Sequence, residues 1–345
     1  MIDSGDRIAV LAHGKFPDRA KTATGVLRYG DYDVAAVLDR DRAGQRVADL
    51  RADPPDAPIV ASMADAPAVD ALVIGIAPIG GGFDDSWRSD VRTAIERGCD
   101  VVAGLHYFLA DDPEFADLAA EHGVSLHDVR RPPEDLGVAT GRADEVDAEV
   151  VLTVGTDCST GKMTTTFELA RAARERGIDA GVVPTGQTGI LIEGRGIAVD
   201  RVVADFAAGA VERMVTEAAA DHDVLFVEGQ GSLAHPAYSG VTLSILHGAA
   251  PDALVLCHAA GREAIHGYED TQIPPVGQVA ELYEDVAAPV GTSEVVAGAL
   301  NTASIEADDD ARAALSAYAA DLGVPAADPV RIGPDPILDA LALEE

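Results

Sequence analysis

The chain has 345 residues, of which 48% are hydrophobic and 4% aromatic, and its formal net charge at pH 7 is −34. This length is typical of two domains, and the hydrophobic content excludes a disordered acidic chain. So negative a surface disfavours nucleic acid as a partner, because like charges repel. Acidic residues are spread along the whole chain, and its only lysines are Lys15, Lys21 and Lys162. We therefore expect a halophilic protein whose surface charge needs molar salt for screening.

Cysteine usage and apolar runs indicate the compartment. The three cysteines, Cys99, Cys158 and Cys257, form no CxxC pair, which favours small buried side chains in a reducing cytoplasm. The first residues form no basic and apolar signal segment, and no run approaches the ~18 apolar residues of a membrane span. We expect a cytoplasmic protein without a membrane contact, and a closed homo-oligomer as the default assembly.

Short apolar runs alternate with helical stretches in the first part of the chain. The runs 8–11, 34–38, 71–74 and 101–103 predict strands. Helices are expected at 90–97 and 113–122, each followed by a glycine. This alternation predicts an α/β fold with a parallel sheet, so we assign residues 1–147 to a Rossmann-like N-terminal domain.

The segment 130–149 holds two prolines and several acids without an apolar period, which indicates a linker. A second α/β domain is expected at 148–345, with a P-loop NTPase-like order of elements. Its first strand, 150–154, leads through a glycine-rich loop into a helix over 162–176. Further elements are predicted as strands at 180–183, 224–227, 253–256 and 295–300, and as helices at 206–220 and 308–322.

The glycine-rich loop is the strongest functional signal. It consists of Gly155, Thr156, Asp157, Cys158, Ser159, Thr160, Gly161 and Lys162. Consecutive backbone N–H groups in such a turn form a concave anion site, and the helix N-terminus adds positive potential. Arginine can replace lysine on a surface but not as a compact phosphate-binding ammonium. The loop therefore predicts a phosphate-bearing nucleotide or cofactor.

Two features of this loop depart from the common P-loop. Five residues separate Gly155 from Gly161, and Met163 stands where Ser or Thr binds magnesium, with Thr164 one residue later. The spacing resembles that of dethiobiotin synthetase and its relatives. Because the methionine argues against ordinary magnesium coordination, we do not predict hydrolysis of ATP.

Three further features resemble that superfamily. The run from Glu228 to Ser232 resembles its Glu-Gly-x-Gly strand end, and Asn301 resembles its base-recognising asparagine. Asp205 resembles its second metal-site carboxylate, so Asp205 and Glu228 are candidate magnesium ligands or proton-transfer groups. Asp205 equally suits the N-cap of a helix.

Other candidate side chains follow predicted strand ends, where ligands bind in open α/β sheets. The strand at 180–183 precedes a candidate substrate loop that consists of Thr185, Gly186, Gln187, Thr188 and Gly189. Glu228, His235 and His258 are candidate catalytic acids or bases. A structural role for the histidines stays open.

The N-terminal domain offers a weaker signal. His13, Gly14 and Lys15 follow the first strand, and Gly80–Gly82 follow the third. Neither run has the GxGxxG spacing of a dinucleotide site. Lys15 and Lys21 indicate an anion contact near this strand end, although both also suit a plain surface position.

Several of these motifs together resemble one two-domain family. They are the His-Gly-Lys run at His13, the loop that ends in Gly161-Lys162-Met163-Thr164, the run from Glu228 to Ser232, and Asn301-Thr302. The chain is similar over nearly its whole length to the DgcN-type D-glutamate N-acetyltransferase family. That resemblance implies transfer of acetyl from acetyl-CoA to the amino group of D-glutamate. Coenzyme A carries a pyrophosphate, so a P-loop can hold it without phosphoryl transfer.

The implied reaction needs a base for the amine and donors for the tetrahedral oxyanion. Glu228 or a histidine would be the base, and Arg262 with the loop at Thr185–Gly189 would bind the substrate carboxylates. Two other classes stay open. One is an ATP-dependent ligase of the dethiobiotin synthetase type with ATP and Mg²⁺ as cofactors. The other is a nucleotide-binding regulatory protein without turnover.

Overall fold

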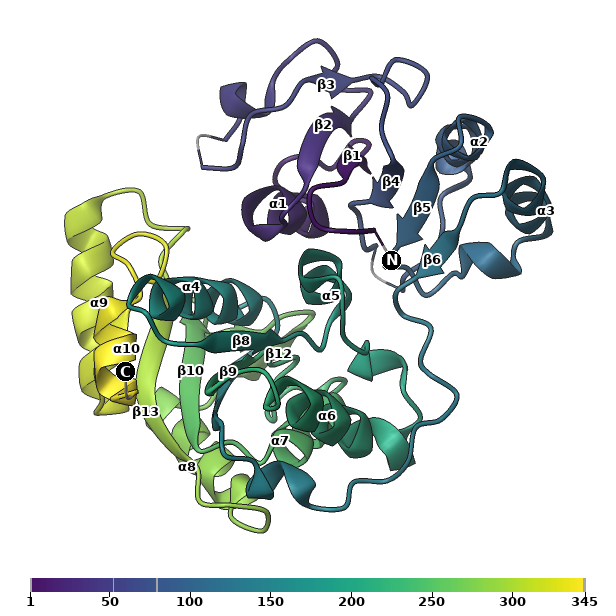
Figure 1. Ribbon diagram of the computed structural model, residues 1–345. Helices are drawn as coiled ribbons and strands as arrows, with labels where there is room; N and C mark the ends of the chain where they lie inside the picture. The colour runs from purple at the N-terminus through teal and green to yellow at the C-terminus, as the bar shows by residue number, and fades with distance from the viewer. Residues whose placement is uncertain (1, 52, 79, 344–345) are drawn as a thin grey trace. The chain divides into compact units, whose positions relative to one another are not determined.

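The structure of the protein is a computed structural model that describes residues 2–51, 53–78 and 80–343. The chain forms two compact units (Figure 1). One unit contains the chain up to Pro133 and the later segment Gln187–Arg201, and the other contains Glu134–Gly186 and the chain from Val202 onward. The expected boundary at residues 147/148 stays a prediction. In the two units, residues 134–147 belong to the second unit and Gln187–Arg201 belong to the first.

The first unit is built on a six-stranded parallel sheet. Its strands, in sheet order, are β3 (Ile59–Val60), β2 (Asp33–Leu38), β1 (Arg7–Leu11), β4 (Ala71–Ile74), β5 (Asp100–Ala103) and β6 (Leu126–Asp128). Its first helices are α1 (Lys21–Tyr29), α2 (Arg88–Glu96) and α3 (Pro113–His122). The strand order reverses between β1 and β4, as in a Rossmann fold. The predicted Rossmann-like domain is therefore confirmed.

Helix α5 (Gln187–Glu193) comes from the second half of the chain but packs in the first unit. The Thr188 and Thr22 hydroxyls lie 2.9 Å apart, and the Tyr32 hydroxyl donates to the Leu191 carbonyl at 2.9 Å. A Cβ on Gly104 would lie 2.9 Å from the Gln187 side chain. A glycine at position 104 thus allows α5 to approach the end of β5.

The second unit contains another six-stranded parallel sheet. Its order is β14 (Ala326–Ala327), β13 (Glu294–Asn301), β10 (Ala253–Ala259), β7 (Glu149–Gly155), β9 (Val224–Val227) and β8 (Ala180–Val183). Six helices of this unit are α4 (Lys162–Glu175), α6 (Ala204–Ala218), α7 (Ser239–Ala249), α8 (Val276–Ala287), α9 (Asp308–Leu322) and α10 (Asp335–Leu341). The middle strands carry apolar residues at nearly every position because helices cover both faces of the sheet. The predicted P-loop α/β fold is confirmed.

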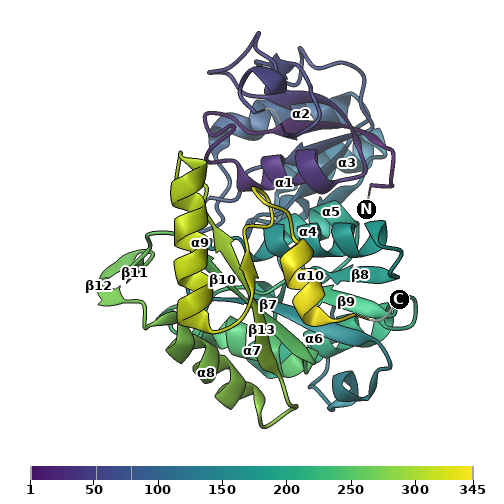
Figure 2. The same ribbon diagram turned by 90° about the vertical axis from the view of Figure 1, so that its left-hand side faces the viewer.

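Some elements of the second unit were not predicted. Helices α7, α8 and α10 were missed, and so was the antiparallel hairpin of β11 (Ala264–Ile265) and β12 (Tyr268–Gln272). Figure 2 shows α9 and α10 beside β13, where both helices contact that strand. Within the described ranges, no helix is long and apolar enough to cross a membrane.

Candidate functional site

The glycine-rich loop lies between the central strand β7 and helix α4. Gly161 has a φ of 108°, which side chains disfavour. Gly155 lies close to the side chains of the loop, since a Cβ there would be 2.8 Å from both Lys162 Nζ and Thr160 Oγ1. Ser159 adopts a φ of 53° although it is not glycine, and such strain is concentrated in ligand-binding loops.

The ammonium group of Lys162 lies inside the loop. Lys162 is 6% exposed, and its Nζ donates a hydrogen bond to the carbonyl oxygen of Asp157 at 2.8 Å. The ammonium therefore lies inside the loop that leads into α4, and the N-terminus of this helix favours an anion. This arrangement can bind a phosphate group.

Asp157 is fully buried and holds the loop from inside. One carboxylate oxygen accepts from Arg262 Nη1 at 3.2 Å and from the His266 N–H at 2.8 Å. The other accepts from the Cys158 N–H at 2.7 Å. Arg262 Nη1 also donates to the Cys158 carbonyl at 2.5 Å. The structure places Arg262 against the glycine-rich loop, whereas we expected it at the substrate carboxylates, and that role stays a prediction.

Two buried hydroxyls anchor the start of the loop. The Tyr283 hydroxyl, from α8, donates to the Gly155 carbonyl at 2.9 Å, and Ser232 Oγ donates to the Thr156 carbonyl at 3.0 Å. Burial raises the pKa of Tyr283 to about 12, so this phenol stays a donor at physiological pH. Sequence reasoning missed Tyr283, because α8 was not predicted and nothing local marks its tyrosine.

Glu228 lies directly after β9 and is 5% exposed. Its Oε2 accepts from the N–H groups of Thr185 and Gly186 at 3.2 and 3.1 Å. Thr185 Oγ1 in turn donates to the Glu228 carbonyl at 2.6 Å. A Cβ on Gly229 would lie 1.7 Å from the Thr153 carbonyl oxygen and 3.3 Å from Lys162 Cδ. The Glu-Gly strand end therefore packs against β7 and the side chain of Lys162.

The candidate substrate loop at Thr185–Gly189 divides between the two units. Thr185 and Gly186 hold Glu228 in the second unit. Gln187, Thr188 and Gly189 open α5 in the first unit. A single substrate loop over these five residues stays a prediction.

His258 is half-buried at the end of β10, and its Nδ1 lies 2.8 Å from Thr156 Oγ1. Its ring stacks on Tyr318 with centroids 5.7 Å apart. Burial lowers the pKa of His258, and the positive charge of Arg262 lowers it further. The imidazole is therefore neutral at pH 7 and able to accept a proton beside the loop.

His235 is 2% exposed, and its Nδ1 accepts from the Ala237 N–H at 3.1 Å. In a neutral ring the proton must then lie on Nε2, so His235 is a donor and not a base. Ligand atoms of Asp157, Cys158 and His235 lie within 4.8 Å of one another. This cluster suits a metal poorly, because the Asp157 oxygens already accept three hydrogen bonds and the free nitrogen of His235 carries a proton.

The remaining candidates lie around α4, β13 and α6. A Cβ on Gly161 would be 3.7 Å from Asn301 Cβ, so Asn301 lies beside the loop. Met163 is buried and Thr164 is half-buried in the first turn of α4. Asp205 is exposed in the first turn of α6, but the N-cap there is Val203. A magnesium site on Asp205 and Glu228 stays a prediction.

Comparison with known proteins assigns the family. A model described as the P-loop domain of a family of unknown function, DUF1611_C, matches residues 137–338, and the Rossmann-like domain DUF1611_N matches residues 40–132. The chain belongs to this family. A crystal structure of a DUF1611 family protein from Anabaena variabilis is 42% identical, with a TM-score of 0.93 over 98% of this chain and 99% of that one.

Two relatives carry a functional name. A protein from a Pseudoalteromonas species is 41% identical over 77% of this chain and 80% of its own length. One from Tritonibacter scottomollicae is 40% identical over 81% of this chain and 83% of its own length. Both are named D-glutamate N-acetyltransferase. The predicted resemblance is therefore confirmed, as is the expectation of an acyltransferase enzyme.

Proposed function

We propose that this chain transfers the acetyl group of acetyl-CoA to the amino group of D-glutamate. The observation that carries the proposal is the P-loop itself, with Lys162 buried inside it and Met163 where a magnesium-binding hydroxyl would stand. Such a loop can bind the pyrophosphate of coenzyme A while offering little for phosphoryl transfer. The relatives named D-glutamate N-acetyltransferase support the substrate.

In this proposal the loop residues from Gly155 to Thr164 hold the pyrophosphate, and Asn301 lies beside them at the Gly161 end. Arg262 acts on the cofactor side, since it holds Asp157 and the Cys158 carbonyl. Burial lowers the pKa of His258, and the positive charge of Arg262 lowers it further, so the imidazole stays neutral. Acetyl-CoA supplies an activated thioester, and the chain supplies its binding and a proton acceptor.

The acetyl-transfer step forms a C–N bond and breaks the C–S bond of the thioester. The neutral amine attacks the acetyl carbon, its surplus proton passes to a base, and coenzyme A leaves as the thiol or thiolate. His258 is our preferred base because its ring is neutral at pH 7. Glu228 is the second candidate, with Oε2 held by two backbone N–H groups. His235 Nε2 can donate a hydrogen bond to a developing oxyanion.

Thiol release tests the proposal. Full-length protein in molar KCl, supplied with acetyl-CoA, should release free thiol when D-glutamate is added, and Lys162→Ala should raise the KM for acetyl-CoA at least tenfold. The raised KM reflects loss of a charge-assisted phosphate contact. Release of ADP from ATP would favour the ligase alternative. Cofactor binding without any product would favour the regulatory alternative.

A further inference from the structure

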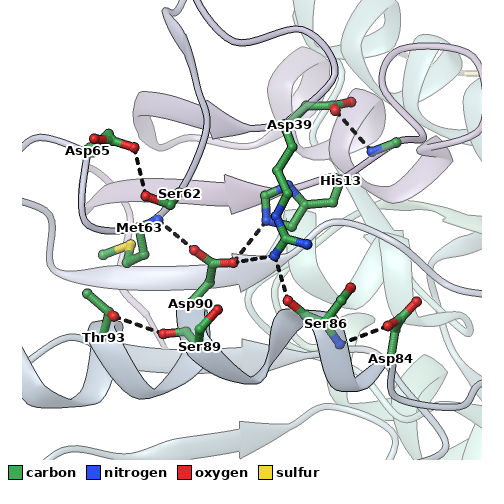
Figure 3. Close-up of polar contacts among 12 residues, drawn as sticks. His13, Asp39, Ser62, Met63, Asp65, Asp84, Ser86, Ser89, Asp90 and Thr93 are labelled. Carbon is green, nitrogen blue, oxygen red and sulfur yellow. Dashed lines mark hydrogen bonds and ion pairs between the residues drawn. The ribbon is translucent and has the colours of Figure 1, made fainter.

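The two units differ in how their polar and aromatic clusters meet solvent. In the first unit, Asp90 accepts from Arg40 Nη2 at 2.9 Å and from the Met63 N–H at 2.7 Å (Figure 3). His13 Nε2 lies 3.0 Å from Asp90 Oδ2, and these two side chains are 5% and 3% exposed. This buried cluster holds the segments after β1, β2 and β3 against α2. In the second unit, by contrast, exposed aromatic side chains border the glycine-rich loop.

These aromatic side chains are two tyrosines that lie against His235. A ring nitrogen of His235 is within 4.8 Å of ligand atoms of Asp157 and Cys158, so this histidine borders the loop. The Tyr238 ring lies 4.6 Å from the His235 ring and the Tyr268 ring lies 5.3 Å from it, between centroids. Tyr238 is 49% exposed and Tyr268 is 42% exposed. Both rings therefore offer accessible apolar surface beside the loop.

The hairpin of β11 and β12 fixes the position of Tyr268. Ile265, which is fully buried, pairs with Tyr268 across the hairpin. The turn between them contains Gly267, with a φ of 79°. In the same turn, the His266 N–H donates to Asp157 Oδ2 at 2.8 Å. The backbone that carries Tyr268 is thus attached to the loop before a ligand binds, which favours binding.

Tyr238 is held at the start of α7. Thr242 Oγ1 lies 2.7 Å from the Gln230 carbonyl oxygen and 3.0 Å from the Tyr238 carbonyl oxygen. A Cβ on Gly231 would lie 2.7 Å from that same Tyr238 oxygen. A glycine after β9 therefore allows α7 to begin close to the strand end. The two tyrosines come from different segments, and each segment is anchored beside the loop.

The two ends of the loop have different neighbours. Asn301 lies beside Gly161, where the loop enters α4, and the tyrosines lie on the side of Asp157, near its start. In coenzyme A, one phosphate of the pyrophosphate carries adenosine and the other carries the pantetheine arm. The two groups therefore leave the pyrophosphate from different ends. With adenosine on the side of Asn301, the arm leaves on the side of the tyrosines.

The chemistry of the arm fits this surface. Next to the pyrophosphate, the arm has a carbon with two methyl groups, followed by a hydroxyl and an amide. A tyrosine ring offers apolar area to methyl groups, and its hydroxyl offers a hydrogen bond to a neighbouring polar group. Covering the methyl groups with the rings removes apolar surface from water, which favours binding.

We propose that Tyr238 and Tyr268 bind the pantetheine arm of coenzyme A, at the part next to the pyrophosphate. This site deepens the proposed function and rests on it for the identity of the cofactor. The acetyl-transfer proposal itself uses neither tyrosine. A nucleotide that lacks the arm makes the loop contacts but not the contacts with the two rings.

Calorimetric titration of the full chain in molar KCl tests this site. The probes are ADP and dephospho-coenzyme A, which is ADP with the pantetheine arm on its terminal phosphate. Tyr268→Ala should weaken binding of dephospho-coenzyme A about tenfold and leave ADP binding within about twofold of wild type, because only the arm contacts the ring. Tyr268→Phe keeps the ring and should bind both probes as wild type does. Leu282→Ala, which alters a side chain on α8 that is 38% exposed, is the control.

Three outcomes would overturn the site: no binding of dephospho-coenzyme A by wild type, unchanged affinity for it in Tyr268→Ala, or equal loss of both probes in that variant. Circular dichroism separates the third outcome from misfolding, and if Tyr268→Ala misfolds, the same result is expected of Tyr238→Ala. Failure of the acetyl-transfer proposal is distinguishable. It would show as binding of dephospho-coenzyme A that depends on Tyr268, without release of thiol from acetyl-CoA when D-glutamate is added.

Discussion

At the residue scale, the buried carboxylate of Asp157 organises the glycine-rich loop. Asp157 accepts from Arg262, His266 and Cys158, and the carbonyl of the same residue accepts from Lys162. The ammonium and guanidinium charges therefore meet around one residue of the loop. A buried charge is stable only when it is paired and hydrogen-bonded, which explains why this aspartate and Arg262 occur together.

His258→Gln tests the base at this scale. We expect kcat to fall about 100-fold, since general-base contributions commonly reach that size, with the KM for acetyl-CoA within about threefold of wild type. The pKa of His258 is lowered from 6.5 by burial and by Arg262. The wild-type rate should therefore decline only below pH 6.5, where His258 gains its proton. The control is His222→Gln, which alters a half-buried histidine that is paired with Asp179. If kcat is unchanged in His258→Gln, the role passes to Glu228.

Some of these residues could be found from local sequence patterns. The others are recognised only from contacts between distant parts of the chain. The places of Lys162 and Glu228 in the fold could be predicted, because both residues belong to short motifs beside strands. Tyr283 contacts Gly155 across 128 residues, and Arg262 contacts Asp157 across 105. No single-sequence pattern reports such pairs. The same limit applies to the contact of His13 with Asp90, which spans 77 residues.

At the scale of elements, a buried carboxylate on α6 holds the segment 137–142, which precedes β7. Glu212 accepts from the N–H and Oγ1 of Thr140, both at 2.8 Å, and from the Arg142 N–H at 2.8 Å. Gly209, on the same helix, would place a Cβ 2.1 Å from the Gly137 carbonyl oxygen. A glycine on α6 is therefore needed for the segment to approach.

Glu212→Gln should destabilise this attachment. Burial opposes the charge, but the hydrogen bonds from Thr140 and Arg142 outweigh it and lower the pKa of Glu212 below its usual 4.5. A lowered pKa contributes stability above the unfolded value, which is lost as pH falls through the folded value. Replacement at pH 7 should lower the free energy of unfolding by about 1–3 kcal/mol, and the difference should shrink below pH 4.5.

Denaturant unfolding in molar KCl at both pH values measures this effect. Glu217→Gln is the matched control on the same helix, because that side chain is 65% exposed and paired only with Arg213 among the ion pairs of the described chain. Equal stability of the Glu212 and Glu217 variants at pH 7 would show that the buried carboxylate does not hold the segment.

The strands were easier to predict than the helices, because buried parallel strands are apolar runs with a glycine or polar residue at their ends. Helices α1, α7, α8 and α10 were not predicted. Nor was helix α5, whose first residues were interpreted as part of a substrate loop. Its sequence lies between two strands of the second unit, yet it packs with α1 in the first. Periodicity reports that a segment is helical but not which sheet it covers.

The charge of the whole molecule predicts a strong dependence on salt. With a formal net charge of −34, self-repulsion opposes the compact state. The screening length falls from about 30 Å at 0.01 M salt to about 3 Å at 1 M. The Tm should therefore rise steeply between dilute buffer and molar KCl, as measured by differential scanning calorimetry. A Tm that is independent of KCl would contradict a halophilic surface.

The most direct test of the whole account is identification of the product by mass spectrometry. The protein, in molar KCl, is supplied with acetyl-CoA, ATP, Mg²⁺ and D-glutamate, and L-glutamate is used in a parallel reaction. The account predicts N-acetyl-D-glutamate and free coenzyme A in equal amounts, with ATP unchanged. Formation of ADP with a ligated product, or no acetylated product from either enantiomer, would contradict it.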